Sequence, residues 1–301
     1  MRARTPAPPP SRRRAAARRQ AVLFIAPAFL AYACFVLVPL CMSLFYSTLN
    51  WDGIGEWSFA GLSNYVTVLT DDDLLQIIGN AFELVLWFTV VPVCVGLAVA
   101  SAIRGQMAGR FGTATRTILF LPQVIPLVAA GIAWSWMYDW NGVVNQALVL
   151  VGLEDQVRGW LGNFTFALPA VGLIGAWVLL GLCTILLVTG IAKIDGSLYE
   201  AAKLDGARPR HEFRFITLPG LRQEIGVCVT VTIIQALSSF DIVYVATSGG
   251  PGIETTVPGL EIYRLAFAHR QVGLASALAI VLMILVLVCV LPIQWAVRER
   301  K

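Results

Sequence analysis

The sequence predicts an all-α membrane protein with six transmembrane helices. Its 301 residues are 57% hydrophobic and only 13% charged, and the mean hydropathy is +0.75. Soluble domains are nearer half apolar and a quarter charged, so the composition alone favours the membrane class. The charges fall between long uncharged stretches, and nearly all Lys and Arg lie in alternate intervals between them.

The helices are predicted from stretches long enough to cross a bilayer. About 20 mainly apolar residues span a hydrocarbon core of roughly 30 Å. Five uncharged stretches reach this length: Ala21–Tyr46, Leu84–Ile103, Thr117–Tyr138, Phe164–Ala192 and Gln271–Val297. A sixth, Ile225–Thr247, contains only Asp241. After the first helix, we expect helices at about 80–103, 117–138, 164–192, 223–247 and 271–297.

The N-terminal part is predicted to divide into a basic tail and a retained first helix. Residues 1–20 are rich in Pro, Ala and Arg, which predicts a disordered tail that either contacts anionic lipid or only sets the topology. The apolar run after the tail is too long for a signal peptide. We therefore assign residues 21–75 to the first helix and an external segment, and residues 76–297 to the transmembrane domain.

The distribution of Lys and Arg predicts the orientation, because cytoplasmic loops of membrane proteins carry an excess of both. With six spans, 19 of the 22 basic residues fall on the side that holds both termini, and three fall on the other side. The densest internal group lies in the segment 193–222. This segment and both termini are therefore expected in the cytoplasm.

The sequence predicts no metal site and no cofactor. All six cysteines fall inside the expected helices without the close spacing of metal ligands, so they are interpreted as packing residues. His211 and His269 are expected on opposite sides of the membrane, too far apart to share a metal ion.

The charged segment between the fourth and fifth expected helices has the signals of two short helices. Ser197 and Glu200 match a capping box, which predicts a first helix that begins at Ser197. Gly206 is a natural stop for that helix, and Pro209 fits the first turn of a second one that runs to Leu218-Pro219. An ordinary solvated loop is the alternative, but this combination favours a surface shaped for docking.

These residues resemble the EAA loop of binding-protein-dependent ABC importer permeases. The similarity lies in Glu200-Ala201-Ala202, Asp205-Gly206-Ala207 and Leu218-Pro219. A later run, Phe240-Asp241-Ile242-Val243-Tyr244-Val245, is similar to carbohydrate-uptake permeases of the first maltose and glycerol-3-phosphate permease type. Asp195 departs from the family pattern, which usually has proline before the helix, and Arg208 stands where Ser or Thr is common.

The resemblance implies a type-1 ABC importer permease fold, a location in a bacterial-type inner membrane and a set of partners. A second, similar permease, two ATP-binding subunits and an extracytoplasmic solute-binding protein are expected, with a sugar or sugar-like solute as cargo. The choice of sugar would rest largely on the binding protein. In that family the EAA loop is a coupling helix, which implies a coupling role for seven residues: Glu200, Ala201, Ala202, Asp205, Gly206, Leu218 and Pro219.

The chain itself is not expected to be an enzyme, and it cannot be the ATPase, because it contains no G-x-x-x-x-G-K-[ST] phosphate loop. ATP hydrolysis would take place in a separate subunit. The alternatives are an ion-coupled secondary transporter, which would need several paired intramembrane charges, a membrane enzyme and a sensor subunit. For a sugar path we single out the polar groups of Ser239, Asp241 and Tyr244 and the ring of Trp177, although Asp241 could be a helix-end residue and Trp177 a packing residue.

Overall fold

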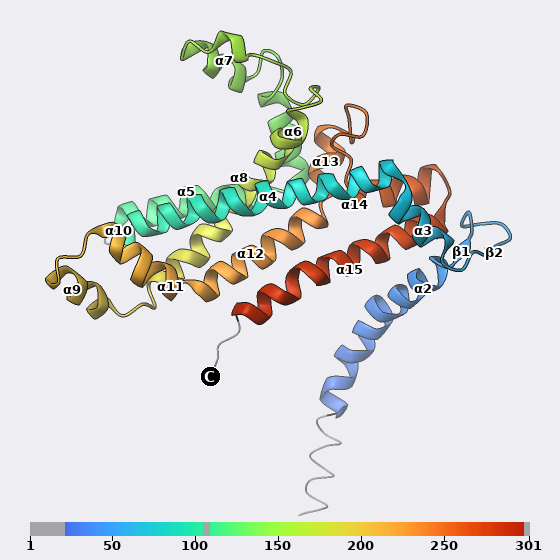
Figure 1. Ribbon diagram of the computed structural model, residues 1–301, viewed down its shortest axis with the longest axis horizontal. Coiled ribbons are helices and arrows are strands. Elements are labelled where there is room, and N and C mark those ends of the chain that lie inside the picture. Colours follow the sequence, from blue (N-terminus) through green and yellow to red (C-terminus); the bar gives the residue numbers. More distant parts are fainter. Residues whose placement is uncertain (1–21, 105–108, 298–301) are drawn as a thin grey trace, which may run out of the picture.

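A computed structural model describes residues 22–104 and 109–297 of the chain (Figure 1). The predicted disordered tail, residues 1–20, lies outside the described residues. Within them the chain is helical except for its connections and one short antiparallel pair of strands, β1 (Leu49–Asn50) and β2 (Ser58–Phe59). The all-α prediction is confirmed for this part of the chain.

Long helices form a bundle in which α4 and α8 are the central pair (Figure 1). The bundle consists of α4 (Asp72–Ala102), α5 (Arg110–Val124), α8 (Ala167–Ile191), α12 (Arg222–Leu237) and α15 (Val272–Val297). Two glycines allow α4 and α8 to approach closely, since a Cβ atom at Gly172 or Gly175 would overlap the rings of Trp87 or Phe88. Small residues at helix contacts are typical of membrane bundles, where close packing replaces the hydrophobic effect.

Four helices are long and apolar enough to cross a membrane: Val22–Tyr46, Asp72–Ala102, Ala167–Ile191 and Val272–Val297. A fifth span is possible if the bent pair α5 and α6 (Leu127–Met137) counts as one. At 16 residues, α12 falls short of a full crossing alone. The described residues thus support four or five spans, and the count of six stays a prediction.

The helix expected at 117–138 is not continuous. It breaks between α5 and α6, and the axes of the two pieces differ by 99°. Ile125 adopts an extended backbone with ψ 128°, because the ring of Pro126 disfavours helical backbone in the residue before it.

The helix expected at 223–247 is also divided. It ends at Leu237, and a separate short helix, α13 (Asp241–Ala246), follows after a break.

The helix expected at 80–103 begins earlier than predicted, at Asp72. Its first turn is capped by Asp71, whose carboxylate accepts a hydrogen bond from the Leu74 N–H at 3.0 Å.

The first predicted helix, Val22–Tyr46, is present and ends in η1 (Ala33–Leu37) and α2 (Val38–Tyr46). It leans away from the bundle in Figure 1 and meets it where α2 packs against α15. The apolar window of this helix buries none of its residues within the chain. Its apolar surface therefore faces lipid or another chain.

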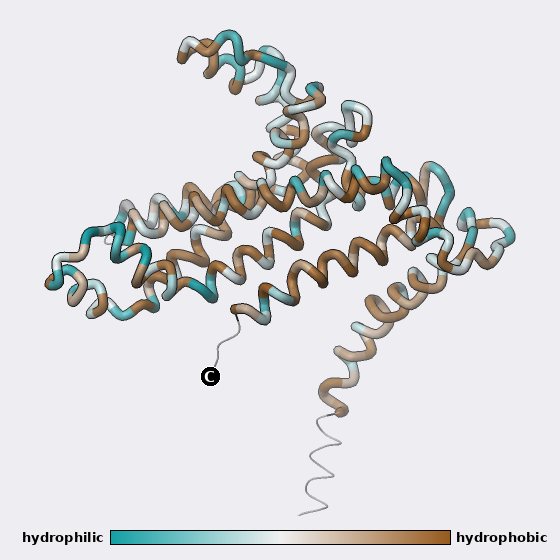
Figure 2. Tube along the Cα trace, viewed as in Figure 1, coloured by the Kyte–Doolittle hydropathy of each residue, from teal (hydrophilic) through white to brown (hydrophobic). Residues whose placement is uncertain are grey.

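The remaining elements are short and lie outside the long helices of the bundle. They are α3 (Ser63–Thr70), α7 (Val143–Leu150), η3 (Glu154–Gln156), α14 (Pro258–Tyr263) and η5 (Arg264–Ala268). Together with α6, α7 projects from the side of the bundle in Figure 1. Figure 2 shows that the bundle helices are mostly hydrophobic, while the hydrophilic residues concentrate at the turns and at the end that carries the segment 196–220.

Candidate coupling loop and transmembrane cavity

The charged segment forms two short helical arms at one end of the bundle (Figure 1). The first arm is α9 (Gly196–Leu204). The second is a nearly continuous helical run of α10 (Pro209–Glu212), η4 (Phe213–Thr217) and α11 (Leu218–Gly220). The two predicted helices are therefore present, and the second extends slightly past Leu218-Pro219.

The start of α9 differs from the predicted capping box. Asp195, not Ser197, is the N-cap, and its Oδ1 accepts a hydrogen bond from the Ser197 N–H at 3.0 Å. The backbone N–H of Ser197, followed by its hydroxyl, holds the pKa of the Asp195 carboxyl below its ordinary value. Glu200 is exposed and makes no cap. Asp195, which departs from the family pattern, thus supplies the cap itself, two residues earlier than expected.

The end of α9 matches the prediction. Gly206 has φ +72°, a left-handed conformation that residues with a Cβ atom adopt only with strain. Its N–H donates to the Lys203 carbonyl at 3.0 Å, and the Ala207 N–H donates to the Ala202 carbonyl at 2.9 Å. This pair of bonds is a Schellman motif, which ends the helix and fixes the direction of the chain toward the second arm.

The outer surface of the two arms is partly apolar and faces away from the bundle. Leu204 is 90% exposed, Phe215 67% and Leu198 52%. Exposed apolar residues of this size, rimmed by charged side chains, are typical of surfaces that bind another protein. Of the seven predicted coupling residues, Ala202 is half-buried and the other six are exposed, with five on α9 and its end and two on α11.

A cavity of about 310 Å³ lies in the bundle between the α5–α6 break and the α12–α13 break. Its wall is formed by the α5–α6 break, the α12–α13 break and the facing surfaces of α4 and α8. Polar groups line it at the breaks: Gln123, Gln235, Ser238, Ser239 and Asp241. Irregular backbone within a membrane bundle is tolerated where it lines such a cavity, and broken helices often mark a solute site.

Sequence reasoning missed both glutamines of this cavity, Gln123 and Gln235. The Oε1 atom of Gln123 is buried and has no hydrogen-bond partner among the described residues. An unpaired buried carbonyl is costly, and Gln123 lies in the cavity wall, so a solute would satisfy this amide once the side chain turned toward the cavity. The signal was present in the sequence, since Pro122 and Pro126 flank Gln123 in a stretch expected to be one helix.

Two of the four predicted path residues line the cavity and two do not. Ser239 and Asp241 line the cavity, and Asp241 is the first residue of α13. Tyr244 does not line it, and its ring stacks on Phe240 with centroids 5.2 Å apart. Trp177 packs edge-on against Trp134 at 5.6 Å, which matches the packing interpretation.

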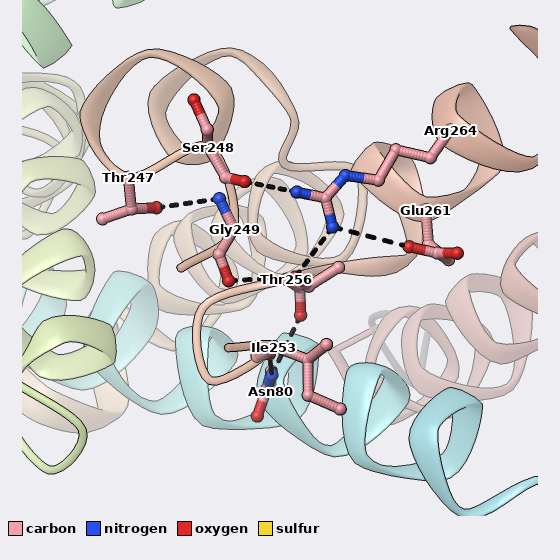
Figure 3. Close-up of polar contacts among 8 residues, drawn as sticks. All are labelled: Asn80, Thr247, Ser248, Gly249, Ile253, Thr256, Glu261 and Arg264. Carbon is pink, nitrogen blue, oxygen red and sulfur yellow. Dashed lines mark hydrogen bonds and ion pairs between the residues drawn. The ribbon is translucent and has the colours of Figure 1, made fainter. Parts of the chain in front are cut away.

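The loop after α13 is held by a polar network that reaches α4 (Figure 3). Nδ2 of Asn80 on α4 donates to the carbonyls of Ile253 and Thr256, each at 2.9 Å. The Arg264 guanidinium donates to the Ser248 carbonyl and lies 3.8 Å from Glu261. These contacts attach the loop, with its Ser-Gly-Gly-Pro-Gly run at residues 248–252, to α4 and to the start of η5.

A larger groove, about 900 Å³, lies at the opposite end of α12, between α8, α12 and α15. It is open and contains none of the predicted path residues. The smaller cavity is the better candidate for a solute site, because it lies at the two helix breaks and is lined by Ser239 and Asp241. Among the described residues, no group of three or more His, Cys, Asp or Glu side chains could hold a metal ion.

Comparison with known proteins places these features in a family. Residues 93–299 match the family model described as "Binding-protein-dependent transport system inner membrane component". A probable ABC transporter permease of Bacillus subtilis, YurN, is 33% identical over 267 residues, which is 88% of this chain and 91% of the relative. The lactose transport permease LacF of Rhizobium radiobacter is 32% identical over 284 residues, 93% of this chain and 94% of the relative.

The diacetylchitobiose uptake permease NgcF of Streptomyces coelicolor is 33% identical over 270 residues, 85% of this chain and 76% of the relative. Among solved structures, a chain of a bacterial alginate ABC transporter in complex with a pentasaccharide-bound periplasmic protein superimposes with a TM-score of 0.78. The superposition covers 93% of this chain and 95% of the alginate transporter chain. The two sequences are only 23% identical, so this similarity is evidence for the fold and not for the function.

Proposed function

This chain belongs to the family of binding-protein-dependent transport system inner membrane components, and from that membership we propose that it is one of two permease subunits of an ATP-driven sugar importer. Its relatives include permeases named for lactose, diacetylchitobiose and multiple-sugar transport. The proposed complex adds a second similar permease, two ATP-binding subunits and an external solute-binding protein. The proposed location is a bacterial-type inner membrane, with both termini in the cytoplasm.

The observation that carries the proposal is the surface of the segment 196–220. Two short helices are held at a fixed angle by the turn at Gly206, and they present Leu198, Leu204 and Phe215 to the outside. An ATPase that receives this surface would transmit its closure to the bundle through α9 and α11. Glu200, Ala201, Ala202 and Asp205 then lie on the contacting arm.

The proposed solute path runs through the cavity between the helix breaks. Ser239 and Asp241 offer hydrogen-bonding groups that suit sugar hydroxyls, and the side chain of Gln123 lies in the same wall. The volume of about 310 Å³ lies at the lower end of the range for small-molecule sites. Tyr244 and Trp177 are outside the cavity wall, so we assign them no direct contact in this conformation.

An ion-coupled secondary transporter remains the alternative function. That mechanism needs several paired charges within the spans. In the described residues the three ion pairs, Arg104–Glu212, Lys193–Glu224 and Arg264–Glu261, all lie near the ends of the helices. No observation therefore favours it over the ATP-driven importer.

Purification of the tagged chain from its native membrane tests the proposal. A protein with a phosphate-loop ATPase sequence should purify with the unaltered chain. Leu204→Asp should abolish this association, since it places a charge in the apolar docking surface. Leu150→Asp on α7 is the matched control, because that leucine is 86% exposed but lies on a different part of the molecule.

Retention of the ATPase by Leu204→Asp at the level of the control would refute the docking surface. Absence of any ATPase from the unaltered chain would refute the ATP-driven importer.

A further inference from the structure

A buried cluster on the inner side of the two arms joins them to the end of α4. Arg104 lies two residues after the end of α4 at Ala102, and its Nη2 donates to Oε2 of Glu212 on α10 at 2.6 Å. The Arg104 guanidinium also lies 3.7 Å from the ring centroid of Tyr199 on α9. The Tyr199 hydroxyl is 3.0 Å from Oγ1 of Thr217 on η4. One arginine therefore contacts both arms at once.

The cluster is more buried than the other ion pairs at this end of the molecule. Glu212 is 5% exposed, Tyr199 7% and Thr217 3%. The side chain of Arg104 is 28% exposed, so its charge is only partly screened by water. Removal of Arg104 would leave the Glu212 carboxylate buried without its cation, which is a strongly unfavourable arrangement. The geometry of the arms relative to α4 thus depends on this one side chain.

The same helix holds the opposite loop. Asn80 precedes Arg104 by 24 residues, which corresponds to about 36 Å along an α-helix. Its amide donates to the carbonyls of Ile253 and Thr256 in the loop after α13 (Figure 3). Helix α4 runs without a break from Asn80 to Ala102. It is therefore a continuous connection between the loop at one end of the bundle and the docking arms at the other.

We propose that Arg104 is a positioning residue that clamps both docking arms to α4, so that a displacement of the arms moves α4 and, through Asn80, the loop 248–256. The clamp belongs to this chain whatever protein docks on the arms. Its role in transport rests on the proposed function, because an ATPase is the partner expected to displace the arms.

A distance measurement tests the clamp without any partner protein. Spin labels are attached to cysteines placed at Leu204, on the first arm, and at Val90, an exposed residue of α4, after the native cysteines are replaced. Arg104→Gln removes the charge and the contact with Tyr199. We expect a narrow distance distribution in the labelled parent chain, and a broader one with a second population in Arg104→Gln.

The magnitude follows from the bond that is lost. The arms are in equilibrium between an attached and a detached state. Loss of one partner of a hydrogen bond to a charged group shifts such an equilibrium by about tenfold or more, so the ratio of detached to attached arms should rise by at least that factor. Lys193→Gln is the matched control, since it breaks an ion pair at the same end of the bundle, with Glu224 at 3.1 Å, in which the lysine is 73% exposed. The control should keep the narrow distribution.

An unchanged distribution in Arg104→Gln would overturn the clamp. Equal broadening in Lys193→Gln would overturn it as well, because it would show that any charge removed at this end loosens the arms. Glu212→Gln should reproduce the effect of Arg104→Gln, and the double variant should add little, since both changes break the same contact.

A second measurement separates the clamp from the proposed function. In the assembled transporter, Arg104→Gln should raise the number of ATP molecules hydrolysed per solute imported severalfold, while Lys193→Gln leaves it unchanged. If no ATPase associates with the unaltered chain, the proposed function fails, and the clamp still stands or falls by the spin-label distances. If the distances broaden but the ratio stays constant, Arg104 holds the arms without a part in coupling, which contradicts the transmission role.

Discussion

Gly206→Val is the sharpest perturbation of the docking arms. Gly206 has φ +72°, and an added Cβ atom would meet no other atom within 4 Å, so the substitution causes backbone strain without a steric clash. A β-branched residue in such a conformation costs on the order of 1–3 kcal/mol. This strain opposes the two bonds of the Schellman motif, and it should reduce the population of the native turn by a factor of about 5 to 150.

Gly196→Val is a matched control in the same segment. A Cβ atom at Gly196 also meets nothing within 4 Å, and Gly196 has no positive φ. Both variants should insert into the membrane and keep the bundle intact, because neither side chain contacts it. We expect Gly206→Val to lose most ATPase association and solute-stimulated ATP hydrolysis, and Gly196→Val to retain both.

The assay is purification of the complex from membranes, followed by ATP hydrolysis with and without the solute-loaded binding protein. Full association and full stimulation in Gly206→Val would refute the claim that the fixed turn at this position transmits the motion. Equal losses in the two variants would also refute it, since they would point to general sensitivity of the segment to valine.

Three further predictions concern topology, the helix cap and the cavity. Single cysteines at Ile54 and Ser197, in a chain without other cysteines, should react with a membrane-impermeant reagent from opposite sides; reaction of both in intact cells would contradict the six-span topology. Asp195→Ala should destabilise α9 and speed hydrogen exchange in it, and Ser197→Ala should have a smaller effect; the reverse order would restore the capping box as the start of the helix. Gln123→Leu should raise the solute concentration for half-maximal uptake by about tenfold, and Asp241→Asn should change uptake without changing assembly; normal kinetics in both variants would exclude the cavity from the path.

Much of the fold could be predicted because membrane helices are encoded locally. Uncharged stretches gave the positions of the spans at Val22–Tyr46, α4, α8 and α15, although α4 begins before its uncharged part because Asp71 caps it. The turn at Gly206 was predictable for the same reason, since a helix end of this kind depends on one residue and its neighbours.

The breaks in two helices show where composition is an insufficient guide. Thr117–Tyr138 is uncharged throughout, yet Pro126 interrupts it at Ile125. The end of α12 at Leu237 depends on Ser238 and Ser239 and on how α13 packs against α6. Hydropathy measures only whether a segment is apolar enough for the membrane. It cannot show a break in the helix, because irregular backbone is tolerated there when protein surrounds it.

The contacts that assemble the site could not be read from the sequence. Arg104 and Glu212 are 108 residues apart, and Asn80 and Thr256 are 176 apart. Both pairs form only after α4 has packed beside α8 and α12. From the sequence, Arg104 could be interpreted only as one of the cytoplasmic charges. Its contacts with Glu212 and Tyr199, on two different helices, are visible only in the folded structure.

The central claim is that this chain conducts solute through the membrane under the control of a separate ATPase. The most direct measurement is uptake of a radiolabelled sugar by proteoliposomes that contain the purified complex and its loaded binding protein. We expect uptake to require ATP on the side of the docking arms, to persist when proton and sodium gradients are abolished, and to be lost in Leu204→Asp. Uptake driven by an ion gradient without ATP would contradict the account and support a secondary transporter.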